Sequence, residues 1–268
     1  MSYETILTAQ REAIFEIILN RDEKRNAMSF QMIEEISRAV DEAEKAFNDG
    51  ISRVLFFRAN GRAFSSGIDL SGFMNEDPQF GPKWRDNLFA TTSALQHVMN
   101  KIENSSLVTM CLMHGYALGL AMEMSLACDF RIIAERTKYG LPETRLGMIP
   151  DVGGTTRLFK LIGPSRAKEI IMTGRMIDLT QAEQWGIVNY VVPKDDLLKK
   201  AEELAAEILL SAPLAVSYTK RVINAMTDNA RDLQWEAWAQ AQLLRTEDFM
   251  TGVTAVITNQ YPVQWKGK

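Results

Sequence analysis

The sequence has few residues of the kinds that hold metal ions or form disulfide frameworks. It contains two cysteines and two histidines among 268 residues. Cys111 and Cys128 lie inside apolar segments, without CxxC spacing and without a neighbouring His/Cys cluster, so we expect buried thiols in a reducing compartment. The sequence therefore predicts no metal site and a cytoplasmic protein.

Long hydrophobic runs and an excess of basic residues are also absent. No apolar run approaches the roughly 18 residues needed to cross a bilayer. The first twenty residues carry Glu4, Glu12 and Glu16 among apolar positions, unlike a signal or transit peptide. Lys+Arg total 30 against Asp+Glu 34, a net charge of -4, whereas a general nucleic-acid binder usually shows a basic face. We expect neither a membrane nor a nucleic acid as partner.

Several common catalytic motifs are missing as well. The sequence has no G-K-S/T, and GYALGLA at 115–121 lacks the G-x-G-x-x-G spacing, so nucleoside-triphosphate chemistry has little support. No serine lies in a G-x-S-x-G elbow, and His97 and His114 have no fixed partner in sequence. A serine-hydrolase interpretation therefore also has little support.

What the chain does contain is an alternation of strand and helix patterns. Short extended runs and helical runs alternate through about the first 135 residues, which is typical of right-handed crossovers in an α/β core. The pattern is mainly helical from Gly153 onward, and helices continue from about Asp195 to Asn259. We therefore expect an α/β core at 1–195 and a helical region at 196–268, without a second independent core.

Two acids in apolar surroundings, Glu123 and Glu143, stand out in the stretch from His114 to Pro150. Burial disfavours the charged form of a carboxylate and so suits it to acid-base chemistry near neutral pH. Glu123 is surrounded by apolar residues at helical spacing, but a buried ion pair with Arg131 or Arg157 would explain it equally well. The sequence leaves catalysis and ion pairing both open for Glu123.

A second acid, Glu143, follows Pro142 in the loop LPET, and a third, Asp151, precedes two glycines. Alone, Glu143 would be interpreted as a helix-capping or loop carboxylate. Asp151 is expected to be the N-terminal cap of the following helix. Two glycine turns, SSGIDL and GYALGLA, end consecutive predicted strands, where a backbone amide can stabilise an oxyanion.

An ordered set of motifs resembles the crotonase (enoyl-CoA hydratase/isomerase) superfamily. The motifs are AFSSGIDL, HGYALG followed by an acid, ACDFRIIAE, YGLPETRLGMIPDVGGTTRL and IMTGRMIDLTQAEQWGIVNYVVP. The resemblance covers nearly the whole chain. It implies a spiral of ββα units, a C-terminal helical region that builds homotrimers or homohexamers, and an acyl-CoA substrate.

The resemblance also assigns roles to residues of the motifs. The amides of Ile68 and Leu120 would form the oxyanion hole, Glu123 would activate water, and Glu143 would transfer the proton at Cα. Both acids together favour reversible syn hydration of a 2-enoyl-CoA to a 3-hydroxyacyl-CoA, with no cofactor because CoA is part of the substrate. The implied substrate and CoA contacts are Lys24, Arg25, Ser66, Gly67, Asp69, Leu70, Gly119 and, from a neighbouring subunit, Lys266.

Three departures from the family pattern bear on the reaction. Leu120 replaces the usual glycine at the second oxyanion position, and Ser71 stands where some hydratases have a lysine. Asp151 coincides with an acid of dienoyl-CoA isomerases and hydroxyisobutyryl-CoA hydrolases, so isomerisation or thioester hydrolysis using Glu143 and Asp151 stays open. The acyl group is not readable from the residues where the family varies its pocket: Phe73, Met74, Phe80, Trp84 and Leu88.

Overall fold

A computed structural model of the chain describes residues 3–71, 88–225 and 230–260. Its largest element is a six-stranded sheet with the strand order β1-β2-β3-β4-β6-β8. β1 and β2 form an antiparallel hairpin, and every other neighbouring pair is parallel. The strands are β1 (Ile6–Arg11), β2 (Ile14–Leu19), β3 (Val54–Ala59), β4 (Val108–Met113), β6 (Phe130–Ala134) and β8 (Tyr190–Val192).

A second, smaller sheet lies beside the ends of these strands. It contains the parallel pair β5 (Tyr116–Leu118) and β7 (Lys138–Gly140). Single bridges extend it, pairing Met28 with Ile68, Ser65 with Ala117, and Gly140 with Met176. After each of β2, β3, β4 and β6, the chain therefore adds one extended segment to the small sheet. This repeated pattern is the spiral of ββα units that the family resemblance implies.

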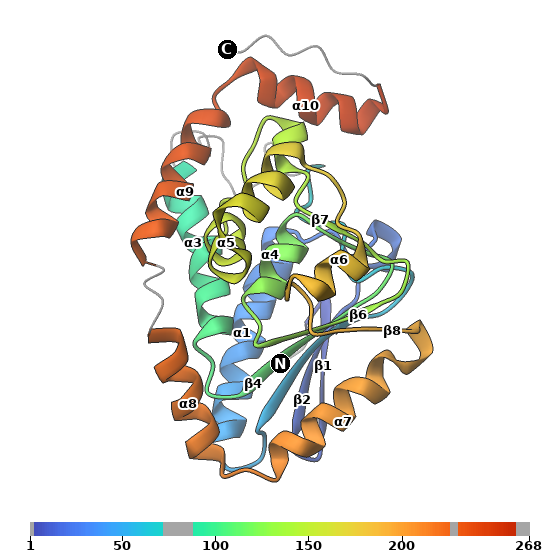
Figure 1. Ribbon diagram of the computed structural model, residues 1–268, viewed down its shortest axis with the longest axis vertical. Helices are drawn as coiled ribbons and strands as arrows, with labels where there is room; N and C mark the ends of the chain where they lie inside the picture. The colour runs from blue at the N-terminus through green and yellow to red at the C-terminus, as the bar shows by residue number, and fades with distance from the viewer. Residues whose placement is uncertain (1–2, 72–87, 226–229, 261–268) are drawn as a thin grey trace.

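Helices connect the successive units and make up most of the C-terminal part of the chain (Figure 1). Ser29 caps α1, because its side chain accepts a hydrogen bond from the Met32 amide at 3.2 Å. α5 changes direction at Gly163, whose φ of 77° is non-helical. The α-helices are α1 (Phe30–Asn48), α3 (Leu88–Glu103), α4 (Leu120–Leu126), α5 (Gly154–Thr173), α6 (Leu179–Gln184), α7 (Leu197–Leu209), α8 (Pro213–Ala225), α9 (Ala230–Leu243) and α10 (Glu247–Thr258); short 3-10 turns are η1 (Asp22–Lys24), η3 (Glu143–Leu146) and η4 (Lys194–Asp196).

The large sheet is covered on both faces. Leu55 and Phe57 belong to the main core with α1, α3 and α4, while Phe56 belongs to a second cluster with Ala201 and Ala205 of α7. Figure 1 shows α7 on the opposite side of the sheet from α1 and α4. This two-sided burial explains why the central strands are continuously apolar rather than alternating. In the described ranges, no helix combines the length and apolar character needed to span a membrane.

The C-terminal helices do not form a layer of their own. α7 packs against β4 and β6, and α9 packs against α3. Leu88 of α3 lies in one apolar cluster with Ala241 and Leu244, at the end of α9, and with Phe249 of α10. The expected boundary at residue 195 stays a prediction, but α3 and α9 together form one wall of the pocket described next.

Candidate active site

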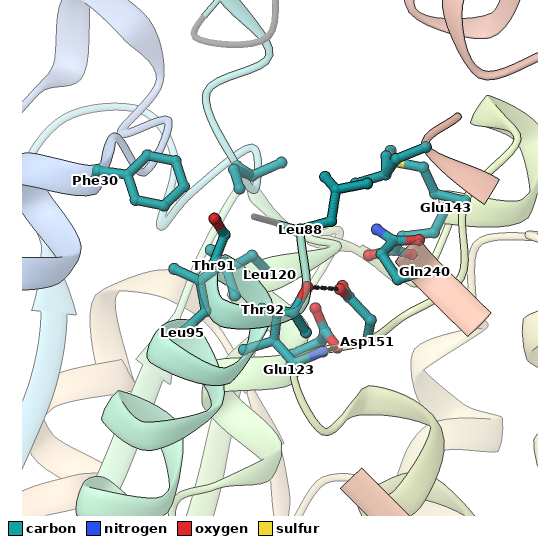
Figure 2. A pocket seen from close by; sticks show the side chains of 14 residues that line it. Phe30, Leu88, Thr91, Thr92, Leu95, Leu120, Glu123, Glu143, Asp151 and Gln240 are labelled. Atoms are coloured by element: carbon teal, nitrogen blue, oxygen red, sulfur yellow. Dashed lines mark hydrogen bonds between the residues drawn. The ribbon is translucent and has the colours of Figure 1, made fainter. Parts of the chain in front are cut away.

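A small buried cavity of about 50 Å³ lies where α1, α3, α4 and α9 converge (Figure 2). A cavity of this size has room for a few water molecules. Among the described residues, three carboxylic acids line it within otherwise mainly apolar walls. Its lining consists of Phe30, Ile68, Leu88, Thr91, Thr92, Leu95, Leu120, Glu123, Glu143, Met148, Asp151, Val152, Gln240 and Leu244.

Glu123 lies in the first turn of α4, where it is 2% exposed. Its Oε1 accepts hydrogen bonds from the Val152 amide at 2.8 Å and the Gly154 amide at 2.9 Å. Arg131 instead donates to the carbonyls of Ile187, Ser125 and Cys128, and Arg157 pairs with Glu103. The ion-pair alternative for Glu123 is therefore wrong, and backbone amides hold this carboxylate at the cavity.

Glu143 begins η3 and is 8% exposed. Its carboxyl lies over Gly119, where a β-carbon would come within 2.8 Å of Glu143 Oε1. Glu143 Oε2 is buried without a hydrogen-bond partner in the described part of the chain. Burial, with a smaller contribution from the charge of Asp151, raises the pKa of Glu143 to about 8. Glu143 is thus mainly protonated at neutral pH and does not act as a helix cap.

The sequence predicts that Asp151 caps α5, and this prediction is wrong. The helix starts three residues after Asp151. Gly153, with φ 104°, is the N-cap residue and α5 begins at Gly154. Asp151 is buried, and its Oδ2 accepts a hydrogen bond from Thr92 Oγ1 at 2.9 Å. The carboxylate lines the same cavity as Glu123 and Glu143, as Figure 2 shows.

The two glycine turns meet at the edge of the cavity. The bridge between Ser65 and Ala117 joins the turn after β3 to β5. Gly67 has φ 96°, and a β-carbon there would lie 2.7 Å from the Leu118 carbonyl oxygen and 3.7 Å from the Leu120 nitrogen. In the described parts of the chain, neither the Ile68 amide nor the Leu120 amide donates a hydrogen bond. The fold therefore brings two amides without acceptors to one small site.

Outside the cavity, the predicted CoA contacts fall in one surface region. Lys24 and Arg25 are exposed, and the Arg25 guanidinium lies 5.9 Å from the centre of the Tyr116 ring. The Arg25 carbonyl accepts a hydrogen bond from the Ser66 amide at 3.1 Å. Asp69 instead forms an ion pair with Arg21 at 3.2 Å.

The remaining predicted positions lie at the edge of the cavity, in a neighbouring apolar cluster, or outside the described residues. Gly67 and Gly119 form the turns at the cavity, while Leu70 packs against the cluster formed by α3, α9 and α10. Leu88 lines the cavity. Lys266 and four predicted acyl-pocket residues lie outside the described residues: Phe73, Met74, Phe80 and Trp84.

Several cavity residues carry no motif and were not predicted. Gln240 of α9 is buried, and its Oε1 accepts a hydrogen bond from the Ile149 amide at 3.2 Å. Thr92, which lines the cavity, and Gln96, which instead contacts the Asp151 backbone, are polar residues at positions four and eight after Leu88, on the buried stripe of α3. A polar residue on an apolar helical stripe is a sequence signal that could have identified the α3 pair. Nothing local identifies Gln240, because its position depends on how α9 packs.

Comparisons with known proteins show which family the chain resembles over nearly its whole length. The profile described as enoyl-CoA hydratase/isomerase matches residues 9–268. The enoyl-CoA isomerase/hydratase fer4 of Mycosarcoma maydis is 33% identical, over 96% of this chain and 94% of the relative. The crotonyl-CoA hydratase of Syntrophomonas wolfei is 32% identical, over 96% of both chains. A crystal structure of an enoyl-CoA hydratase/isomerase from Xanthobacter autotrophicus Py2 superposes with a TM-score of 0.85 at 28% identity, covering 96% of this chain and 94% of the other.

Proposed function

Because the chain belongs to the enoyl-CoA hydratase/isomerase family, we propose that it reversibly hydrates a 2-enoyl-CoA thioester. Water would add syn across the double bond to give a 3-hydroxyacyl-CoA. The observation that carries this proposal is that Glu123 and Glu143 line one cavity, with different surroundings for the two carboxyl groups. Hydration needs one group to activate water and another to supply a proton.

The thioester carbonyl oxygen would accept hydrogen bonds from the amides of Ile68 and Leu120. As water attacks Cβ, negative charge moves onto this oxygen, and two positioned donors stabilise the enolate. The absence of acceptors for both amides in the described structure supports this role. The Leu120 side chain, which also lines the cavity, would narrow the space left for the acyl group.

Glu123 would orient water and remove its proton. Two backbone N–H groups point at its Oε1, and such donors favour the charged form that a base requires. Glu143 would give its proton to Cα. The rise of its pKa to about 8 keeps that proton available at neutral pH. In the reverse direction, Glu143 removes the Cα proton and Glu123 returns one to the leaving water.

Purified protein mixed with crotonyl-CoA provides the direct test. We expect the enoyl absorbance to fall to an equilibrium value and the 3-hydroxyacyl product to appear. A panel of straight-chain, branched and cyclic enoyl-CoA thioesters would then define the acyl group. No loss of enoyl absorbance with any member of the panel would refute the hydratase assignment.

One observation favours a second candidate. Asp151 lines the same cavity as Glu143, so the two acids could move a proton between carbon positions, as in a dienoyl-CoA isomerase, or support thioester hydrolysis. The Asp151→Asn variant separates these candidates. Loss of all turnover would favour the isomerase or hydrolase reaction, whereas retained hydration would exclude an essential proton-transfer role for Asp151.

The proposal extends to binding, assembly and location. The exposed Lys24 and Arg25 would contact the CoA phosphates, and CoA would be the only non-protein group involved. A homotrimer or homohexamer would cover the apolar side chains that α8 exposes, including Leu214 at 62% and Tyr218 at 59%. The free, buried cysteines are consistent with a reducing cytoplasmic environment.

A further inference from the structure

Two buried polar side chains interrupt the apolar stripe of α3, and both contact the same acid. Thr92 is 4% exposed and Gln96 is 6% exposed. Thr92 Oγ1 donates to Asp151 Oδ2 at 2.9 Å, and Gln96 Nε2 donates to the Asp151 backbone carbonyl at 2.6 Å. One helix therefore holds both the side chain and the backbone of Asp151.

We propose that Thr92 is a positioning residue, whose hydroxyl holds the Asp151 carboxylate at the cavity wall so that its charge acts on Glu143. This inference rests on the proposed function for its catalytic consequence, but not for the interaction itself. Figure 2 shows the Thr92–Asp151 hydrogen bond beside Glu123, on the side of the cavity formed by α3. Thr92 would touch neither the substrate nor the reacting atoms in this role.

The charges around Glu143 single out Asp151 as the relevant neighbour. Within the described lining of the cavity, the titratable groups are Glu123, Glu143 and Asp151, while α3 and α9 contribute neutral side chains. α10 packs against η3 and carries Glu247 and Asp248 in its first turn. Of these acids, Asp151 is the one whose charge raises the pKa of Glu143, after the larger effect of burial.

The direction of the effect follows from electrostatics. A hydrogen bond donated to a carboxylate favours its charged form, and a negative charge opposes the ionisation of a second carboxyl group nearby. Without the Thr92 hydroxyl, the Asp151 carboxylate would be less well placed at the cavity wall, and its charge would act less strongly on Glu143. Glu143 would then lose its proton at a lower pH, and the protonated fraction at neutral pH would fall.

The test measures the titration of Glu143 directly, by 13C NMR of protein labelled at the glutamate Cδ, with the signal assigned from Glu143→Gln. The variants are Thr92→Val, which removes the hydroxyl at nearly constant shape, Thr92→Ser, which keeps it, and Asp151→Asn. Thermal unfolding checks that each variant is folded. The pH dependence of kcat/KM with crotonyl-CoA provides a second, independent readout.

We expect wild-type Glu143 to titrate near pH 8. Asp151→Asn should lower this midpoint by about one to two pH units, and Thr92→Val by about half to one unit. Thr92→Ser should titrate as wild type does. The alkaline limb of the kcat/KM profile should move in the same direction, because hydration uses protonated Glu143.

A wild-type midpoint in Thr92→Val together with a lowered midpoint in Asp151→Asn would overturn the role of Thr92. An unchanged midpoint in both variants would overturn the coupling itself. If the NMR midpoints shift as expected while crotonyl-CoA and the other enoyl-CoAs are not hydrated, the positioning role stands and the proposed reaction fails.

Discussion

Glu123 and Glu143 line the same cavity and are similarly buried, yet the structure treats the two carboxyl groups in opposite ways. Glu123 accepts hydrogen bonds from two backbone amides at the start of α5. Glu143 has one oxygen buried without a hydrogen-bond partner in the described structure, and a nearby acid increases the cost of its ionisation. Burial alone therefore does not decide the protonation of an acid. Under the proposed hydration, the backbone donors that surround Glu123 suit it to the role of base, and their absence around Glu143 Oε2 in the described structure suits Glu143 to the role of proton carrier.

The largest expected effect comes from removing either acid-base function. Glu123→Gln and Glu143→Gln should each lower kcat for hydration by about 10² to 10⁴-fold, the usual contribution of a positioned acid or base. Steady-state kinetics with crotonyl-CoA measures both. Near wild-type turnover in either variant would break the division of roles between the two glutamates.

The second expected effect concerns stability. Glu143→Gln and Glu123→Gln should change the free energy of unfolding in opposite directions. Burial raises the pKa of Glu143 from the ordinary value of 4.5 to about 8. Below pH 4.5 the folded and unfolded states both carry the proton. Between pH 4.5 and pH 8 the unfolded state releases it first, so the free energy of unfolding falls as pH rises through this window.

Glu143→Gln removes this titration and should therefore be more stable than wild type at pH 7. The interval of about 2.5 pH units between the ordinary pKa of 4.5 and pH 7 corresponds to about 3 kcal/mol in the free energy of unfolding. The difference should disappear near pH 4. Urea unfolding at several pH values measures it. Glu123→Gln is the matched control, because it replaces charge-assisted hydrogen bonds with neutral ones and should lose about 1 to 2 kcal/mol. Destabilisation of Glu143→Gln at pH 7 would contradict the environment described for this acid.

A smaller loss of activity is expected from the substitution of Gly119, which lies against the Glu143 carboxyl group. Gly119→Ala would place a β-carbon 2.8 Å from Glu143 Oε1, at a position with φ 53°. The displaced carboxyl should lower kcat by about 10- to 100-fold, as expected for a misplacement of about 1 Å. Gly50→Ala is the matched control, because Gly50 has φ 74° and open space around it. It should lose about 1 kcal/mol of stability and keep full activity; equal losses of activity in both variants would point to backbone strain alone.

The sequence predicts much of the fold and half of the site. Apolar runs at 54–59 and 108–113 identify the central strands, because these strands are buried on both faces. Glu123 and Glu143 could be identified as candidates because both lie in one largely apolar stretch, and the family resemblance assigns their roles. The choice between ion pairing and catalysis for Glu123 needed the structure, since it depends on where Arg131 and Arg157 point.

The rest of the site depends on packing between distant segments. Gln240 and Leu244 reach the cavity because α9 lies against α3, and no spacing within α9 indicates this contact. The role expected of Asp151 was wrong because the helix begins after Gly153 rather than directly after the acid. The N-cap lies two residues later than expected, at Gly153 instead of Asp151, and this local shift turns an expected capping residue into a cavity acid.

The position of α9 also has a consequence for synthesis of the protein on the ribosome. The amides of Ile68 and Leu120 and the three acids of the cavity are all made within the first 151 residues, but the wall that contains Gln240 and Leu244 follows some 90 residues later. The described wall of the cavity therefore cannot be complete on a growing chain before α9 has been synthesised and has packed against α3.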